Sequence, residues 1–335
     1  MLDQIRFRQT LLTVLLVVAF TTALLLDTRP TLSLLPVQAT EMQVQLTNAL
    51  ANDGEVTIHQ YSAPPHDQVN SYWLETNNGV IIIDAQRFLS QARYLAKEIR
   101  TVTDKPLLGI FVTHHHTDHI GGLPALIEEL GPNVSIYASQ FVRDDIETDG
   151  SGFLARRKEL HGNDFPAPGD IPLPDQIVTE GDTIELDGLT FEVIEFRDNE
   201  TPVSTIYYLP EQNALFVGDF VTNQRVPFLR NGYSENWITQ LQLLIERYPD
   251  QMVYSGHGEP DLARQLVEAE IEYIETVRGL VTDALSTDSE ITAEEKSSIL
   301  IEMEAQFPNY QSPLLAPGLI EANIDAVAEE LQRQS

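Results

Sequence analysis

An apolar segment that opens directly into a run of histidines constrains this chain more than any other feature. Residues 107–112 (LLGIFV) carry no polar side chain, and residues 113–122 follow as THHHTDHIGG. A short, continuous apolar run is typical of a strand that is covered on both faces. The glycine pair at 121–122 then favours the start of a helix. The histidines are therefore expected on the turn between a buried strand and a helix, where their side chains can converge.

The spacing of these side chains predicts a metal site. Alternate side chains of an extended segment share one face, so His114 and His116 can converge on one ion while His115 points away as a spacer. Asp118 and His119, at the bend, can face a second ion. Imidazole and carboxylate donors suit Zn²⁺, and also Fe or Mn. The chain has no cysteine, which removes thiolate from the site.

Through THHHTDH at 113–119, the chain resembles the metallo-β-lactamase fold superfamily of metal-dependent hydrolases, from about residue 55 to residue 260. The resemblance implies an α/β fold, a four-layer αββα sandwich with further ligands on loops at the same edge. Asp219, after the apolar run 215–218, is then the carboxylate that bridges two ions. His257, in Ser-Gly-His-Gly, is then the last ligand of the second ion. In the superfamily, the aspartate at the position of Asp118 also steers the nucleophile and can shuttle its proton. The resemblance therefore makes Asp118 the candidate catalytic residue.

The third ligand position departs from the superfamily pattern. Where a histidine is usual, in a His-Thr-Pro-Gly loop, this chain has Asn-Glu-Thr-Pro-Val-Ser at 199–204, with Glu200 in place of the histidine. A carboxylate can ligate Zn²⁺, and the loop is similar to the Thr-Glu-Ala-Pro loop of alkylsulfatase-type members. Two interpretations stay open. Either Glu200 completes the first site, or it points away and Asp198 is the fallback donor.

Two segments could supply substrate contacts. Residues 143–174 are polar and contain several Gly and Pro residues, which predicts a long loop near the mouth of the site. Residues 222–237 follow Asp219 and lead into a helix capped by Ser234. A mobile surface loop and ordinary surface placement are the competing interpretations. The candidate contacts are Phe153, Arg156, Arg157, His161, Phe165, Arg225, Phe228, Arg230, Tyr233 and Trp237.

Hydrophobic periodicity predicts strands through most of the chain and helices at its end. The expected strands, besides 107–112, are 55–62 with His59, 71–75, 80–84, 133–138, 177–186, 190–197, 205–209, 214–219 and 252–254. The expected helices are 41–52, 90–101, 261–285, 292–307 and 320–334. The last three form a helical C-terminal extension, residues 261–335. In this superfamily such an extension often covers the active-site mouth or builds a dimer. The competing interpretation is a packing cap on the sandwich.

The first forty residues predict export. Arg6 and Arg8 precede the apolar stretch 11–26, and Val37-Gln38-Ala39 offers a small-residue cleavage site. The stretch is just shorter than the roughly 17–25 residues that span a bilayer, so residues 1–39 are a cleaved signal peptide or an uncleaved membrane anchor. Either way, the catalytic domain at 40–260 is expected in the periplasm or secreted. The formal charge of −31 argues against nucleic acid as a partner.

These features predict an exported, dinuclear metal hydrolase with two Zn²⁺ ions. A water that bridges both ions would be deprotonated near neutral pH and would attack a small ester, lactone, thioester or sulfate ester. The expected ligands are His114, His116 and Glu200 for the first ion, Asp118, His119 and His257 for the second, and Asp219 for both. The alternatives are a metal- or partner-binding module of the same fold without turnover, and a di-iron oxidoreductase. An oligomer is compatible with each.

Overall fold

The structure is a computed structural model that describes residues 49–52, 56–63, 69–286, 290–313 and 316–334. The chain divides into two units, residues 1–42 and 43–335, and all described residues belong to the second. The predicted export segment, most of the helix predicted at 41–52, and His66, which has no ligand-like spacing to the other histidines, therefore lie outside the described residues. Within the described ranges, no helix is both long and apolar enough to cross a membrane.

In the described part of the chain, the first sheet has seven strands in the order β1-β2-β3-β4-β5-β6-β7. Their bounds are β1 Ala49–Asn52, β2 Val56–Ser62, β3 Asn70–Glu75, β4 Val80–Ile83, β5 Leu107–Phe111, β6 Ser135–Ala138 and β7 Gln176–Ile177. The strands β1 to β4 pair antiparallel, whereas β4 to β7 pair parallel. The turn between β3 and β4 contains the pair Asn78-Gly79, which is typical of a tight hairpin.

The second sheet has six strands in the described residues, in the order β13-β12-β11-β10-β9-β8. Their bounds are β8 Thr183–Leu186, β9 Leu189–Arg197, β10 Val203–Leu209, β11 Ala214–Gly218, β12 Met252–Ser255 and β13 Asp261–Leu262. Two bonds tie this sheet to the first beside the histidine segment. The amide of Thr205 donates to the carbonyl of Thr113 at 2.9 Å, and the hydroxyl of Tyr207 donates to the carbonyl of Val112 at 3.0 Å.

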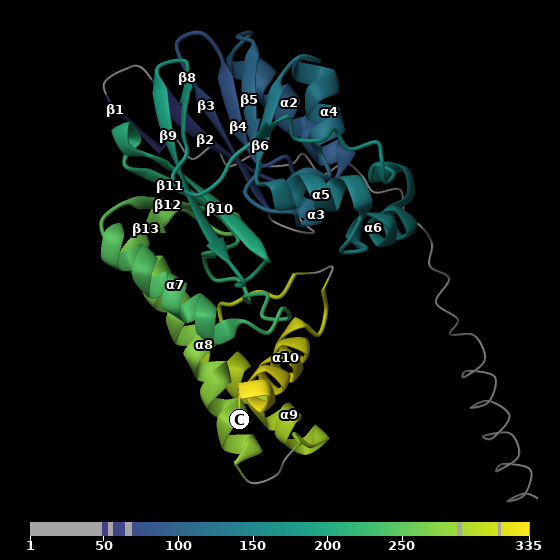
Figure 1. Cartoon of the computed structure of the whole chain (residues 1–335), viewed down its shortest axis with the longest axis vertical. Coiled ribbons are helices and arrows are strands. Elements are labelled where there is room, and N and C mark those ends of the chain that lie inside the picture. The colour runs from purple at the N-terminus through teal and green to yellow at the C-terminus, as the bar shows by residue number, and fades with distance from the viewer. Residues whose placement is uncertain (1–48, 53–55, 64–68, 287–289, 314–315, 335) are drawn as a thin grey trace, which may run out of the picture. The chain divides into compact units, whose positions relative to one another are not determined.

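The two sheets form the middle layers of a sandwich with helices outside (Figure 1). The side chains of β4 alternate, as a strand buried on both faces requires. Val80 and Ile82 belong to the core with α2 (Leu89–Val102) and α4 (Leu123–Leu130), while Ile81 and Ile83 belong to the core between the sheets. The predicted αββα architecture is confirmed.

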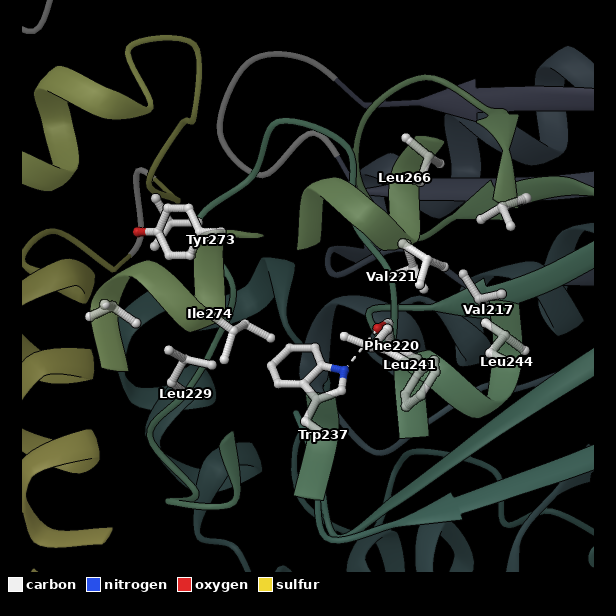
Figure 2. Close-up of a cluster of buried hydrophobic side chains, with 14 of the residues drawn as sticks. Val217, Phe220, Val221, Leu229, Trp237, Leu241, Leu244, Leu266, Tyr273 and Ile274 are labelled. Carbon is white, nitrogen blue, oxygen red and sulfur yellow. Dashed lines mark hydrogen bonds between the residues drawn. The ribbon is translucent and has the colours of Figure 1, made fainter. Parts of the chain in front are cut away.

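The outer face of the second sheet carries α7 (Ser234–Arg247) and α8 (Ala263–Leu285). Figure 2 shows the cluster beneath them, in which the indole of Trp237 donates to the carbonyl of Phe220 at 3.0 Å. The same cluster includes Tyr273 of α8 and buried residues of α9 (Ala293–Gln306) and α10 (Leu319–Gln334). The C-terminal helices, which begin and end close to the predicted positions, therefore share a core with the second sheet.

The prediction of a loop at 143–174 was wrong. Residues there form α5 (Gln140–Thr148), α6 (Phe153–His161) and a 3-10 turn at Gly162–Asp164. Asp149 ends α5 in the left-handed conformation, and its carboxylate accepts hydrogen bonds from the amides of Leu154 and Ala155, each at 2.9 Å. One aspartate thus satisfies the first turn of α6, in place of a capping residue next to the helix.

Three smaller predictions were also wrong. Residues 49–52 form a strand instead of a helix end, and 177–186 is divided between β7 of the first sheet and β8 of the second. Ser234 does not cap α7. The carboxylate of Glu330, from α10, accepts the amides of Ser234 and Glu235 at 2.9 and 3.1 Å. A side chain far along the chain therefore does the work expected of a local cap.

Candidate metal centre

The predicted ligands come together in two groups, on loops that follow β5, β9, β11 and β12 and on the short helix α3 (Thr117–Ile120). Within each group the possible ligand atoms lie within 4.8 Å of one another. The first group consists of His114, His116, Glu200 and Asp219, and the second of Asp118, His119, Asp219 and His257. Asp219 belongs to both. Its Oδ1 lies 3.3 Å from His119 Nε2, and its Oδ2 lies 3.3 Å from His257 Nε2 and 3.9 Å from His114 Nε2.

Several ligand atoms of these groups are buried without a hydrogen-bond partner among the described residues. They are His114 Nε2, His119 Nε2, both carboxylate oxygens of Glu200, and Asp219 Oδ1. Buried polar atoms are normally paired, because an unpaired one costs about 1–3 kcal/mol. Nitrogen and oxygen atoms that converge unpaired on two points are what divalent cations require. The donor set therefore fits two metal ions.

Asp84 orients two of the histidines from behind. Its carboxylate lies 2.7 Å from Nδ1 of His119, and it accepts the amide and hydroxyl of Thr113 at 2.9 and 2.8 Å. The Thr113 hydroxyl in turn lies 3.0 Å from Nδ1 of His114. Partners on Nδ1 leave Nε2 of both rings facing the ligand groups, as outer partners of metal-binding histidines do. The sequence prediction missed this residue, although Asp84 follows an apolar strand just as Asp219 does.

Glu200 points into the first group. Its side chain is buried, with Oε2 at 3.8 Å from His114 Nε2. Its Oε1 lies 2.9 Å from His116 Nδ1, but the orientation of the two groups does not make this contact a hydrogen bond. Burial raises the pKa of Glu200, and the neighbouring His116 opposes this effect. Asn231 holds the loop by donating to the carbonyl of Glu200 at 2.6 Å. Asp198, the alternative donor, is exposed and belongs to neither group.

Arg87 was not predicted, yet it touches the second group. Its Nη2 lies 3.0 Å from Asp118 Oδ2, and its Nη1 donates to the Thr117 hydroxyl at 2.6 Å. Burial alone would raise the pKa of Asp118, but Arg87 and the adjacent histidines hold it well below its usual range. Burial alone would lower the pKa of His257, but the carboxylates of Asp219 and Asp118 outweigh this effect and raise that pKa to about 9. The second group thus favours a positive charge between its carboxylates.

Two glycines allow the ligand loops to approach one another. A Cβ on Gly256 would lie 2.2 Å from Asp219 Oδ1 and 2.9 Å from His119 Cε1. Gly218 has a φ of 55°, and a Cβ there would lie 2.4 Å from the Thr113 hydroxyl. Any larger residue at either position would displace a ligand or its support.

A cavity of about 410 Å³ opens onto both groups, a size typical of small-molecule sites. The acidic residues in its lining, Asp118, Glu200 and Asp219, all belong to the ligand groups. Its other charged lining residues are arginines: Arg87, Arg156, Arg157, Arg225 and Arg230. In a chain of net charge −31 this is a local concentration of positive charge. The cavity therefore favours a negatively charged occupant.

The structure separates the other candidate contacts into two sets. Phe153, Arg156, Arg157, Arg225, Phe228 and Arg230 line the cavity. Phe165 and Trp237 are buried in the cores, Tyr233 is exposed, and the ring of His161 packs against Phe88.

His115 belongs to neither ligand group, but the prediction of an outward-facing spacer was wrong. Its side chain is buried, stacks on Phe153 with ring centroids 5.8 Å apart, and has Nδ1 at 2.8 Å from the Thr201 hydroxyl. Burial lowers the pKa of His115 to about 2, so its ring is neutral. The contact joins the histidine segment to the loop of Glu200. His59 lies in β2, as predicted.

A two-sheet sandwich whose loops carry two groups of metal donors at one edge defines a class of metal-binding α/β proteins. Within that class, the model of the family described as "Metallo-beta-lactamase superfamily" matches residues 64–257. The chain belongs to the metallo-beta-lactamase superfamily of metal-dependent hydrolases. This confirms the resemblance drawn from residues 113–119.

Curated relatives and solved structures agree with this assignment. A linear primary-alkylsulfatase of Pseudomonas sp. is 27% identical over 226 residues, which cover 58% of this chain and 42% of that protein. A hydroxyacylglutathione hydrolase of Chromohalobacter salexigens is 26% identical over 196 residues, 58% of this chain and 64% of that protein. The chain thus spans less than two thirds of either relative. The crystal structure of a beta-lactamase domain protein from Burkholderia ambifaria shares the fold, with a TM-score of 0.61 at 18% identity, over 85% of this chain and 87% of that one.

Proposed function

We propose that this protein is a dinuclear metal-dependent hydrolase. His114, His116 and Glu200 would hold one divalent ion, Asp118, His119 and His257 would hold the other, and Asp219 would contact both. The observation that carries this proposal is the set of buried, unpaired ligand atoms in two groups that share Asp219. Zn²⁺ is the expected ion because the donors are imidazole and carboxylate.

When bound, the ions would supply a hydroxide nucleophile near neutral pH and polarise the bond to be cleaved. The residues of the chain would provide the geometry. Asp84 and Thr113 keep the histidine rings turned so that Nε2 faces the groups. Asp118 lines the cavity with its carboxylate fixed by Arg87, which makes it the candidate for carrying a proton during turnover.

The substrate would be a small molecule with a hydrolysable ester, thioester, lactone or sulfate ester and a negative charge. The arginines that line the cavity support the negative charge, since guanidinium groups match carboxylate and sulfate oxygens. A sulfate ester is supported further by the alkylsulfatase relative and by the glutamate in the third ligand position.

The proposal is tested by metal content and turnover measured together. Purified protein loaded with Zn²⁺ is analysed for zinc per chain and assayed with 4-nitrophenyl acetate and 4-nitrophenyl sulfate, for the parent, Glu200→Ala and Asp198→Ala. We expect about two zinc ions in the parent, about one in Glu200→Ala with turnover lost, and parental values in Asp198→Ala. Metal unchanged in Glu200→Ala would remove that residue from the ligand set. A parent that binds zinc but hydrolyses neither compound nor other esters would favour a binding module.

We also propose that residues 1–39 direct export and that residues 40–260 and 261–335 are the catalytic domain and a helical extension. The basic residues before the apolar stretch 11–26 support export. Fractionation of cells that express the full chain with a C-terminal tag would test this. Tagged protein outside the cytoplasm, either shortened by about 39 residues or bound to membranes, is expected. Full-length protein in the cytoplasmic fraction would contradict it.

A further inference from the structure

The C-terminal end of the chain holds the cavity loop in place. We call residues 311–313 and 316–333 the C-terminal arm, and residues 222–233 the cavity loop. The backbone of Gln311 accepts the amide of Val226 at 3.1 Å and donates to the carbonyl of Gln224 at 3.0 Å. Near the other end of the arm, the guanidinium of Arg333 donates to the carbonyl of Gly232 at 3.2 Å. The arm thus clamps the cavity loop at both ends.

Asn323 of α10 holds the middle of the same loop. Its side chain is buried, accepts the amide of Leu229 at 3.0 Å and donates to the carbonyl of Pro227 at 2.7 Å. Phe228 lies between these two bonds, and its ring meets the ring of His116 with centroids 5.2 Å apart. One amide side chain therefore fixes the segment that presents an aromatic ring both to the cavity and to a candidate ligand.

The arm also forms an apolar wall of the cavity. Its lining residues are Pro313, Ala316, Pro317, Gly318, Leu319 and Ala322, none of which is charged. Figure 1 shows α10 in yellow, across from α6 in teal. From α6, Phe153 and Leu160 line the same cavity, and Leu160 is 60% exposed. An apolar group between these walls would cover surface that is otherwise in contact with water.

We propose that the C-terminal arm determines substrate specificity, in that Leu319 and Ala322 set the length of the apolar group that the cavity accepts. Asn323 is the positioning residue that holds Phe228 against this group. The ligand class is an anion with an alkyl or acyl chain. The assignment of the hydrolysable bond rests on the proposed function, whereas the apolar wall does not.

Straight-chain alkane-1-sulfonates test the wall, because they are anionic and contain no bond that the proposed hydrolase would cleave. Binding of butane- and decane-1-sulfonate, below micellar concentration, is measured by calorimetry on the zinc-loaded full chain. The variants are Ala322→Trp and, as a matched control on the exposed face of the same helix, Glu329→Trp. We expect Ala322→Trp to raise the Kd of decanesulfonate at least about tenfold, the loss expected when about two methylene groups find no room. Butanesulfonate should bind Ala322→Trp as it binds the parent, and Glu329→Trp should bind both anions as the parent does. An equal Kd of decanesulfonate in the two Trp variants would overturn the proposal.

Two further variants keep the test decisive if Ala322→Trp does not fold. Leu319→Ala enlarges the cavity at this wall and should shift the binding preference toward the longer sulfonate. Asn323→Leu should weaken binding of decanesulfonate more than that of butanesulfonate, and Asn323→Asp, which keeps the acceptor for the Leu229 amide, should fall between it and the parent. A merely structural role of Asn323 would lower the melting temperature without changing chain-length preference. If the parent shows no hydrolysis and the chain-length dependence of binding is still observed, the proposed function is contradicted and this inference is not. If it hydrolyses esters and the pattern is flat, this inference fails alone.

Discussion

The two halves of the sandwich contribute to the site in different ways. The first half, with sheet β1 to β7, supplies His114, His116, Asp118 and His119 from one continuous segment. The second half supplies Glu200, Asp219 and His257 from three separate loops. Each ligand group contains members of both halves. Bound ions would therefore link the two sheets, and the metal site would be part of what holds the sandwich together.

The largest effect should come from Asp219→Asn, because Asp219 is the residue that both groups share. Removing one carboxylate charge next to both sites should lower zinc content below one ion per chain at limiting metal and reduce kcat/KM by about a thousandfold or more. Zinc titration and steady-state kinetics measure both. Asp250→Asn, at a surface turn of the same half, is the control. Two tightly bound ions in Asp219→Asn would show that neither ion depends on Asp219 for binding.

Metal removal should lower the stability of the whole sandwich. A ligand at a thousand times its Kd stabilises the native state by about 4 kcal/mol, which corresponds to a fall of about 10 °C in Tm on chelation. Calorimetric melts with and without chelator measure it. In Glu200→Ala, which leaves Asp219 as the one second-half ligand of the first group, the fall should be smaller. Equal melting temperatures with and without zinc would break the link between metal and sheet packing.

A smaller effect is expected from Asp84→Asn, which alters support from the first half without removing a ligand. The carboxylate accepts three hydrogen bonds, one from His119 and two from Thr113. An amide cannot accept all three, because its nitrogen only donates, so metal affinity should fall about 10–100-fold. A competition titration with a chromophoric chelator measures the affinity, with exposed Asp104→Asn as the control. Metal affinity should fall more at the site that contains His119 than at the site that contains Glu200. Identical losses at both sites would mean that Asp84 supports the fold of the loop instead of one ring.

The same contrast between the halves explains what the sequence could predict. His114 to His119 could be assigned as candidates from local spacing, because one strand end brings them together. Glu200, Asp219 and His257 were found only through resemblance, since no local pattern links three loops so far apart. Arg87 and Asp84 were missed because their roles depend on contacts about thirty residues away. The helix α6 was missed because only Leu154 of its residues is buried, too few for a hydrophobic period.

The smallest effect concerns the first half alone. His59 stacks on Trp73 with centroids 3.7 Å apart, and neither ring nitrogen has a hydrogen-bond partner among the described residues. Burial lowers the pKa of His59 below 6.5, although Glu75 opposes this. Between that lowered pKa and 6.5 the unfolded chain binds more protons than the folded one, so stability is fully present above about pH 6.5 and is lost as the pH falls through this window.

Replacing His59 by Phe keeps the stack and removes the titration. The fall in Tm between pH 8 and pH 5, measured on chelated protein so that metal release does not contribute, should be smaller in His59→Phe than in the parent. The ligand histidines titrate in both proteins, so only the difference reports on His59. Zinc content at pH 8 should be the same in both, because the ring lies in β2 and belongs to neither ligand group. An equal fall in Tm in the two proteins would mean that His59 does not cause the acid sensitivity of the first half, and that its metal-binding segment does.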